Sequence, residues 1–186
     1  MTRVPVVTRE NVAEKYRKAF DEVTASVGRP IVKGPAAVMI NSPEMSKRAM
    51  NLSEFLRKES VLPDKIKELG ILMAARANDC QYIWNAHAAL ARKAGLSNSL
   101  VDAIRDKKPL PKDIPTDEAT AAIYGAELLR THKVSQQTFD AVIKWFGSQG
   151  LTELATTMGY YTLMAFNANT FDVDVAPDQA EPVLPV

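Results

Sequence analysis

Residues 68–95 read ELGILMAARANDCQYIWNAHAALARKAG, and this stretch holds the densest group of chemically reactive side chains in the chain. The group consists of one carboxylate, the only cysteine, two aromatic residues and one of the two histidines: Glu68, Cys80, Tyr82, Trp84 and His87. All five lie within 20 residues of one another. No other segment concentrates such side chains, so both the fold and the function are judged from this stretch outward.

The stretch predicts two antiparallel helices with a break at Asn78 and Asp79. Either residue can cap the second helix by accepting hydrogen bonds from its first N–H groups, which have no partner within the helix. We expect the second helix to run from about Cys80 to Ala94. Gly95 then ends it, because glycine enters the left-handed conformation without a Cβ clash.

One face of the second helix carries the cysteine and the histidine together. The residues at helical spacing on this face are Cys80, Ile83, Trp84, His87 and Ala91. Seven residues at about 1.5 Å rise separate the thiol from the imidazole by roughly 10 Å. This distance is too long for a direct hydrogen bond, so the helix alone does not predict a Cys80–His87 ion pair.

Glu68 and His87 are expected within direct or one-water hydrogen-bonding distance, because they lie at similar separations from the break. A carboxylate on one ring nitrogen fixes the tautomer and raises the basicity of the other, which suits a general base. The helix dipole favours a thiolate at Cys80, although Asp79 opposes it. The alternative is structural, with Cys80 a small buried hydrophobe and His87 a core histidine bonded to a carbonyl.

The spacing of these residues resembles a known family signature. Glu68, eleven residues, Cys80, six residues, His87, then Ala91 and Gly95 is similar to the pattern of the carboxymuconolactone decarboxylase and AhpD-like alkylhydroperoxidase superfamily. The resemblance extends over about residues 43–171. It implies an all-α fold, an AhpD-like bundle of about eight helices in a single domain over residues 1–186.

One position departs from the redox members of that family. Those members carry a second cysteine three residues after the first, and this chain has Ile83 there. Without a resolving thiol an intramolecular disulfide cycle cannot close. The run from Tyr82 to His87, YIWNAH, is instead similar to the aromatic-and-histidine variant of the decarboxylase-like members.

The resemblance implies a cofactor-independent decarboxylase, isomerase or lactone-processing enzyme that acts on a small carboxylated metabolite. His87 would transfer the proton, and Glu68 would orient the imidazole of His87. Arg76 could bind a substrate carboxylate, with a solvated helix-end arginine as the alternative, and Tyr82 and Trp84 would contact the substrate. No metal or cofactor is expected.

Two other functions stay open. The first is a thiol peroxidase or disulfide reductase in which Cys80 is the peroxidatic thiol and a second subunit or an external thiol resolves it. The second is a non-catalytic helical scaffold or small-molecule binding protein. His132 has no acidic or thiol neighbour at useful spacing and is expected to be a turn residue.

The composition is typical of one soluble domain: 186 residues, 46% hydrophobic and 24% charged. A net charge of +1 shows no electrostatic footprint for nucleic acid or an anionic membrane. One cysteine excludes an intrachain disulfide framework. Since no apolar run approaches 18 residues or resembles a signal peptide, a cytoplasmic location is expected.

Capping and proline signals predict the other helices at about 8–27, 35–40, 43–58, 63–77, 98–106, 116–130, 135–146 and 151–169. Several of them, including 43–58 and 116–130, have apolar faces that we expect to be buried. On residues 43–58 that face comprises Met45, Ala49, Leu52, Phe55 and Leu56. On residues 116–130 it comprises Ala119, Ile123, Ala126 and Leu129. Residues 171–186 should wrap a surface or remain disordered.

The last helix, about residues 151–169, is apolar or aromatic on nearly all sides. Such a helix is either central to a monomer or shared with another subunit. We expect a homo-oligomer, a trimer or a dimer-based hexamer, with the site near a subunit boundary, because tyrosine and methionine are common in subunit interfaces. The alternative is a monomer in which the other helices surround this one.

Overall fold

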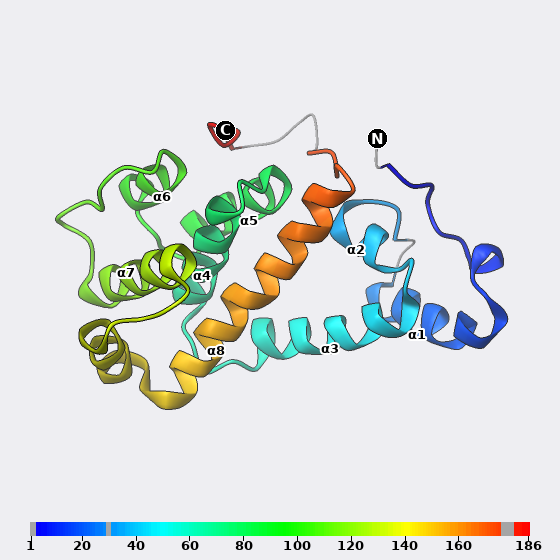
Figure 1. Cartoon of the computed structure of the whole chain (residues 1–186), viewed down its shortest axis with the longest axis horizontal. Coiled ribbons are helices and arrows are strands. Elements are labelled where there is room, and N and C mark those ends of the chain that lie inside the picture. The colour runs from blue at the N-terminus through cyan, green and yellow to red at the C-terminus, as the bar shows by residue number, and fades with distance from the viewer. Residues whose placement is uncertain (1–2, 29–30, 176–180) are drawn as a thin grey trace. The chain divides into compact units, whose positions relative to one another are not determined.

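The computed structural model describes residues 3–28, 31–175 and 181–186, and the regular structure in these ranges is entirely helical (Figure 1). Two short 3-10 helices, η1 (Arg9–Asn11) and η2 (Glu14–Tyr16), precede eight α-helices. These are α1 (Arg17–Val27), α2 (Gly34–Met39), α3 (Pro43–Lys58), α4 (Asp64–Ala77), α5 (Gln81–Lys93), α6 (Asn98–Arg105), α7 (Thr116–Thr131) and α8 (Gln136–Thr170). The all-α prediction is confirmed.

The chain divides into two compact units. The first comprises Met1–Glu59 and Phe166–Asp174, and the second comprises Ser60–Ala165 and Val175–Val186. The reactive stretch lies in the second unit. The single functional domain expected from the sequence stays a prediction. None of the helices in the described ranges is both long and apolar enough to cross a membrane.

The first helix begins later than the sequence predicted. Instead of one helix from Thr8, the chain makes η1 and η2 and then enters α1 at Arg17. The Thr8 hydroxyl donates to Asn11 Oδ1 at 2.7 Å rather than capping a helix. Val12 is extended and only 7% exposed, so burial of its side chain breaks the helix that the local pattern favoured.

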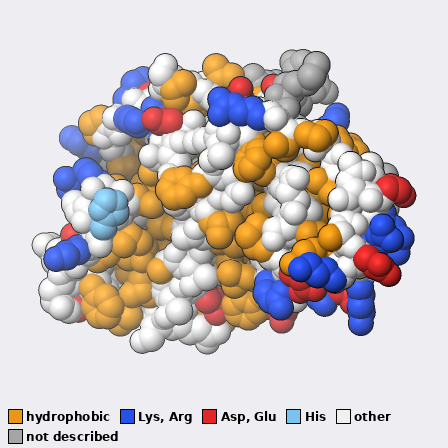
Figure 2. All heavy atoms as spheres, turned by 45° about the vertical axis from the view of Figure 1, so that its right-hand side comes forward, with side chains coloured by type: hydrophobic (Ala, Val, Ile, Leu, Met, Phe, Trp, Pro, Cys, Tyr) orange, Lys and Arg blue, Asp and Glu red, His pale blue; other side chains and the backbone are white. Residues whose placement is uncertain are grey.

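The buried face of α3 also differs from the predicted one. Of the expected stripe, Leu56 is buried, but Met45, Leu52 and Phe55 are 45%, 41% and 38% exposed. The helix buries Pro43 and Ser46 instead, because it packs against α1 and α2 with a rotated face. Hydrophobic side chains accordingly reach the molecular surface in several places (Figure 2).

Helix α4 is the central helix of the second unit and packs against α5, α6 and α7. Ile66, Leu69 and Leu72 on this helix are fully buried. At Gly70 an added Cβ would lie 3.0 Å from Leu154 Cδ1, so the absence of a side chain there lets α8 approach closely. Burial on several sides gives α4 the rigidity needed to position a site residue.

Helix α8 contains the break that its glycines predicted. Gly147 has φ 66° and ψ 179°, a conformation that only glycine adopts readily, and it divides α8 into two helical parts. The Ser135 hydroxyl accepts from Thr138 N–H at 3.3 Å and caps the first part, as expected. Within the second unit, Leu154 and Met158 of the second part are buried, whereas Leu163 is 42% exposed.

A buried carboxylate, Glu153, binds the first residues of the second unit. Glu153 is 6% exposed and accepts hydrogen bonds from the Ser60 hydroxyl at 2.6 Å, Val61 N–H at 2.8 Å and the Gln149 amide at 2.9 Å. Burial by itself raises the pKa of Glu153. The hydrogen bonds from Ser60, Gln149 and Val61 outweigh burial and hold the pKa below its ordinary value.

Replacing Glu153 with glutamine should lower the free energy of unfolding at pH 7 by about 1–3 kcal/mol, because an amide cannot accept this full set of bonds. Since the folded pKa is depressed, the carboxylate stabilises the fold above its unfolded pKa, and this contribution disappears as pH falls through the folded pKa. Urea unfolding of both proteins at pH 7 and pH 3 should therefore show a difference that shrinks in acid. Glu54→Gln, at a side chain 60% exposed, is the control and should have a small effect at both pH values.

Candidate functional site

The turn between α4 and α5 places the site residues, although its capping differs from the prediction. Neither Asn78 nor Asp79 caps α5: Asn78 ends α4, with its side-chain amide donating to Ala74 O at 2.8 Å. Asp79 has φ 49°, and Cys80 occupies the N-cap position of α5. Gly95 follows the C-cap of α5 with φ 106°, as predicted.

The predicted contact between Glu68 and His87 is confirmed. His87 Nδ1 lies 2.9 Å from Glu68 Oε2, and the two side chains are 14% and 19% exposed. An ionised carboxylate only accepts hydrogen bonds, so with Glu68 in that form a neutral His87 would carry its hydrogen on Nδ1 and keep the lone pair on Nε2. Partial burial strengthens the interaction while leaving the imidazole accessible.

Tyr161 from α8 packs against the imidazole of His87. Its ring meets His87 edge to face, with ring centroids 5.0 Å apart and an interplanar angle of 83°. Tyr160 packs against Tyr161 in a similar arrangement at 5.5 Å. The sequence analysis missed Tyr161 as a site residue, because its pairing with His87 depends on how α8 crosses α5. The imidazole is thus oriented by a hydrogen bond and by aromatic packing together.

Cys80 is a free cysteine and is fully buried. Burial raises the pKa of its thiol above the ordinary value, although the N–H groups of Tyr82 and Ile83 at the start of α5 act in the opposite direction. The helix terminus favours the thiolate, as the sequence suggested, but desolvation dominates. A thiol in this setting is a poor nucleophile at neutral pH.

The two aromatic residues predicted to contact substrate differ in burial. Trp84 is fully buried, and its indole N–H has no hydrogen-bond partner among the described residues. Tyr82, two residues earlier in the chain, is partly exposed. Together with Cys80, Ile83 and Ala91, Trp84 forms the buried stripe of α5 that was predicted. The role of Tyr82 and Trp84 in substrate binding stays a prediction.

Arg76 is not the solvated helix-end arginine of the alternative interpretation. It is 7% exposed, its Nη1 forms a salt bridge with Asp79, and its Nη2 donates to Pro185 O at 2.9 Å. It lines a cavity of about 870 Å³ to which Glu68 and His87 do not contribute. Its proposed contact with a substrate carboxylate stays a prediction.

A short segment at the end of the chain covers part of α5. Gln81 exchanges two hydrogen bonds of 2.8 Å with the backbone of Leu184, which is 2% exposed. The Asn85 amide donates to Glu181 O at 3.0 Å, and Arg92 Nε lies 3.1 Å from the Glu181 carboxylate. The expectation that the tail wraps a surface holds for residues 181–186, whereas residues 176–180 lie outside the described residues.

Comparison with known proteins supports the predicted family. Residues 43–108 match the model of the carboxymuconolactone decarboxylase family, and this segment contains Glu68, Cys80 and His87. This partial match, together with solved structures of AhpD-like proteins that share the fold, supports the carboxymuconolactone decarboxylase and AhpD-like superfamily. No curated protein sequence matches the chain.

Solved structures of the same fold show the range of this superfamily. The alkylhydroperoxidase AhpD core of an uncharacterized peroxidase-related protein from Ralstonia eutropha JMP134 has a TM-score of 0.72 and 19% identity, over 95% of this chain and 93% of that one. An uncharacterized peroxidase-related protein from Silicibacter sp. TM1040 has a TM-score of 0.70 and 14% identity, over 95% and 92%. The debrominase Bmp8 has a TM-score of 0.69 and 13% identity, over 95% and 94%.

These likenesses establish an AhpD-like fold, and the superfamily includes enzymes of several kinds. The chemistry of this member must therefore be argued from its own residues. In the described ranges no group of three or more histidine, cysteine or acidic side chains is arranged to hold a metal ion.

Proposed function

We propose that this superfamily member is a lyase-type enzyme that moves a proton on a small carboxylated or lactone-like metabolite, with decarboxylation or isomerisation as the outcome. The observation that carries this proposal is the 2.9 Å contact between His87 Nδ1 and Glu68 Oε2. It gives an imidazole of defined tautomer in a partly buried position, which is the arrangement that general acid–base catalysis requires.

The chemistry follows from the two nitrogens of His87. In an isomerisation, Nε2 accepts a proton from a carbon next to a carbonyl and returns it to another carbon of the enolate, while the Glu68 carboxylate stabilises the intermediate imidazolium. In a decarboxylation, the bond to the carboxylate breaks, CO2 leaves, and protonated Nε2 delivers its proton to the carbanion that remains and regains one from water. The T-shaped contact with Tyr161 restrains the orientation of the ring. Glu68 is a positioning residue, and His87 is the catalytic residue.

A second candidate function is thiol peroxidase activity through Cys80. Two structural neighbours are described as peroxidase-related, and the thiol lies at the start of α5, where the Tyr82 and Ile83 amides favour a thiolate. In such a cycle the thiolate attacks one peroxide oxygen, the O–O bond breaks, the other oxygen leaves as water or an alcohol, and the sulfenic acid that forms is reduced by two external thiols, which become a disulfide. Full burial and a raised thiol pKa make this the weaker candidate.

The two candidates are separated by Cys80→Ala. Wild type and variant should be assayed against a panel of small carboxylated and lactone substrates, and separately against hydrogen peroxide and tert-butyl hydroperoxide with dithiothreitol. We expect acid or lactone turnover to be unchanged within about threefold, because the thiol takes no part in proton transfer.

The thiol itself provides a control. In the folded protein a disulfide reagent should label Cys80 slowly at pH 7–8 and rapidly after unfolding in urea, since burial disfavours the thiolate. Peroxide consumption that disappears in Cys80→Ala, together with fast labelling of the folded protein, would reject the acid–base proposal in favour of the peroxidase. A protein inactive in both assays would favour the non-catalytic binding protein.

A further inference from the structure

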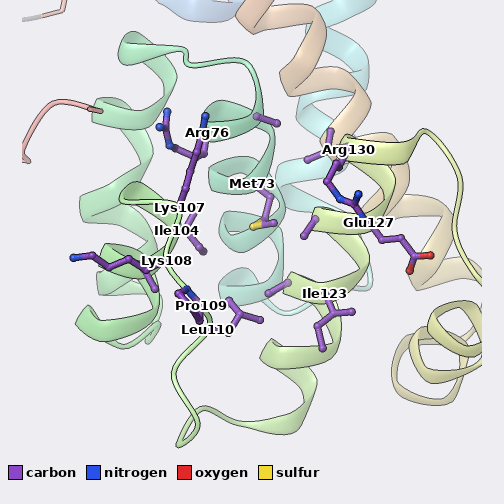
Figure 3. Close-up of a pocket in the computed structure, with 15 residues that line it drawn as sticks. Met73, Arg76, Ile104, Lys107, Lys108, Pro109, Leu110, Ile123, Glu127 and Arg130 are labelled. Atoms are coloured by element: carbon purple, nitrogen blue, oxygen red, sulfur yellow. The ribbon is translucent and has the colours of Figure 1, made fainter. Parts of the chain in front are cut away.

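The cavity beside Arg76 is a feature that the proposed acid–base chemistry does not use. It lies within the second unit between α4, α6, α7 and the segment after α6, and has a volume of about 870 Å³ (Figure 3). Cavities of roughly 300–1,000 Å³ are the size class of small-molecule sites. Its apolar lining comes mainly from Met73, Ala77, Ala103, Ile104, Pro109, Leu110, Ala122, Ile123, Ala126 and Leu129.

The α7 wall of this cavity corrects the sequence prediction. The apolar face of α7 was expected to be buried in the core, yet Ile123 is 51% exposed and Ala126 is exposed as well. Ile123, Ala126 and Leu129 line the open cavity instead. The residues of α7 that are buried are chiefly Ala121, Ala122 and Tyr124. An apolar helix face that borders an open space is available to an apolar ligand.

Four cationic side chains and one acidic side chain line the cavity. Figure 3 shows Arg76 and Lys107 on one side of Met73 and Arg130 on the other. The fourth cation, Lys108, pairs with Asp106 at 2.9 Å. The acid, Glu127, is already engaged, since it accepts from Ser135 N–H at 2.6 Å.

Arg76 places a buried guanidinium group beside the cavity. It is more than nine-tenths buried and lines the cavity, and its Nε has no hydrogen-bond partner among the residues that the structure describes. Asp79 and Pro185 satisfy only the other two guanidinium nitrogens. The Nε atom itself is covered by protein, so Arg76 contributes positive charge to the cavity rather than an open donor. Lys107, 3.4 Å from Asp79, adds positive charge at the same end.

We propose that this cavity binds a small amphipathic anion, a carboxylate on an apolar aliphatic or aromatic body. The apolar body contacts the Ile123, Ala126 and Leu129 face of α7. The carboxylate is held by Arg76 and Lys107 at one end or by Arg130 across the cavity. The site is separate from the Glu68–His87 pair, so its occupant is a second ligand and the proposal is independent of the proton chemistry.

The test uses 4-phenylbutyrate as the anionic probe and 4-phenylbutanamide as its uncharged match. Isothermal titration calorimetry with the full chain should show binding of the carboxylate, and at least fivefold weaker binding of the amide. The double variant Lys107→Gln/Arg130→Gln should weaken carboxylate binding by roughly tenfold, because it removes a partly solvated cation at whichever end holds the carboxylate. The control Lys144→Gln/Arg48→Gln removes the same charges elsewhere and should leave binding within twofold.

A steric variant addresses the apolar wall. Ala126→Trp should abolish binding of both probes, because an exposed alanine that lines the cavity can be enlarged without disturbing the core. Ala126→Ser should retain binding. Thermal unfolding of each variant confirms that it is folded.

Three results overturn the proposal. Equal affinity for the carboxylate and the amide would remove the role of the cations. No binding of either probe at millimolar concentration would remove the ligand site. Dissociation of an oligomer by Ala126→Trp, seen in sedimentation velocity, would show that a second copy of the chain occupies the cavity instead.

Discussion

Replacing His87 with alanine should lower kcat/KM for the acid–base reaction by about 10²–10⁴, the usual contribution of a positioned general base. Alanine removes the imidazole that the Glu68 carboxylate orients at 2.9 Å, and with it the group that would transfer the proton. Steady-state kinetics should be measured on the most active substrate of the carboxylate and lactone panel. Most of the loss should appear in kcat, because the base interacts with the transferring proton mainly in the transition state and not in the bound substrate.

Two further variants sharpen this expectation. Glu68→Gln keeps the shape of the side chain but can present its amide N–H₂ to the ring and favour the wrong tautomer, so it should lower kcat less than His87→Ala and alter its pH profile. His132→Ala removes the other histidine, an exposed residue in the left-handed C-cap position of α7, and should leave kcat unchanged. Equal activity of wild type and His87→Ala would rule out proton transfer by this residue.

Trp84→Ala should lower the free energy of unfolding by about 3–5 kcal/mol, the typical loss for removing a fully buried aromatic side chain. Trp84 is fully buried on the stripe of α5, where α5 packs against α4. Its removal leaves a cavity that the neighbouring helices fill only in part. Equilibrium unfolding in guanidinium chloride measures the change directly.

Trp84→Phe tests which part of the side chain matters. The indole N–H is buried without a hydrogen-bond partner in the described residues, so its removal relieves a penalty of about 1–3 kcal/mol that partly offsets the lost volume. Phenylalanine should therefore cost much less stability than alanine. Trp145→Ala, at a position 50% exposed, is the control and should change stability by less than about 1 kcal/mol. Equal losses for the two Trp84 variants would contradict this prediction.

Much of the site was accessible from local sequence signals. The break at residues 78–79, the proline and serine starts of α3 and α6, and the glycine ends of α1 and α5 depend on a few adjacent residues. Glu68 and His87 meet because two helices joined by a short break must run antiparallel. Their contact required no knowledge of the rest of the fold.

Other features depend on packing between distant segments. Periodicity identified apolar faces on α3 and α7, but it could not tell whether each face meets another helix, solvent or a cavity. The same limit applies to η1 and η2, where burial of Val12 outweighs helix propensity. The corrections at Met45 and Ile123 are both of this kind.

The sequence by itself determined the helical class, the resemblance to the superfamily and the Glu68–His87 pair, because spacing along the chain controls each of them. Only the tertiary structure decided the burial of Cys80 and Arg76, the packing of Tyr161 on the imidazole, and the position of residues 181–186 along α5. Each of these depends on segments that are far apart in the chain. A residue's exposure, and with it the direction of a thiol pKa, depends on which other segments surround it.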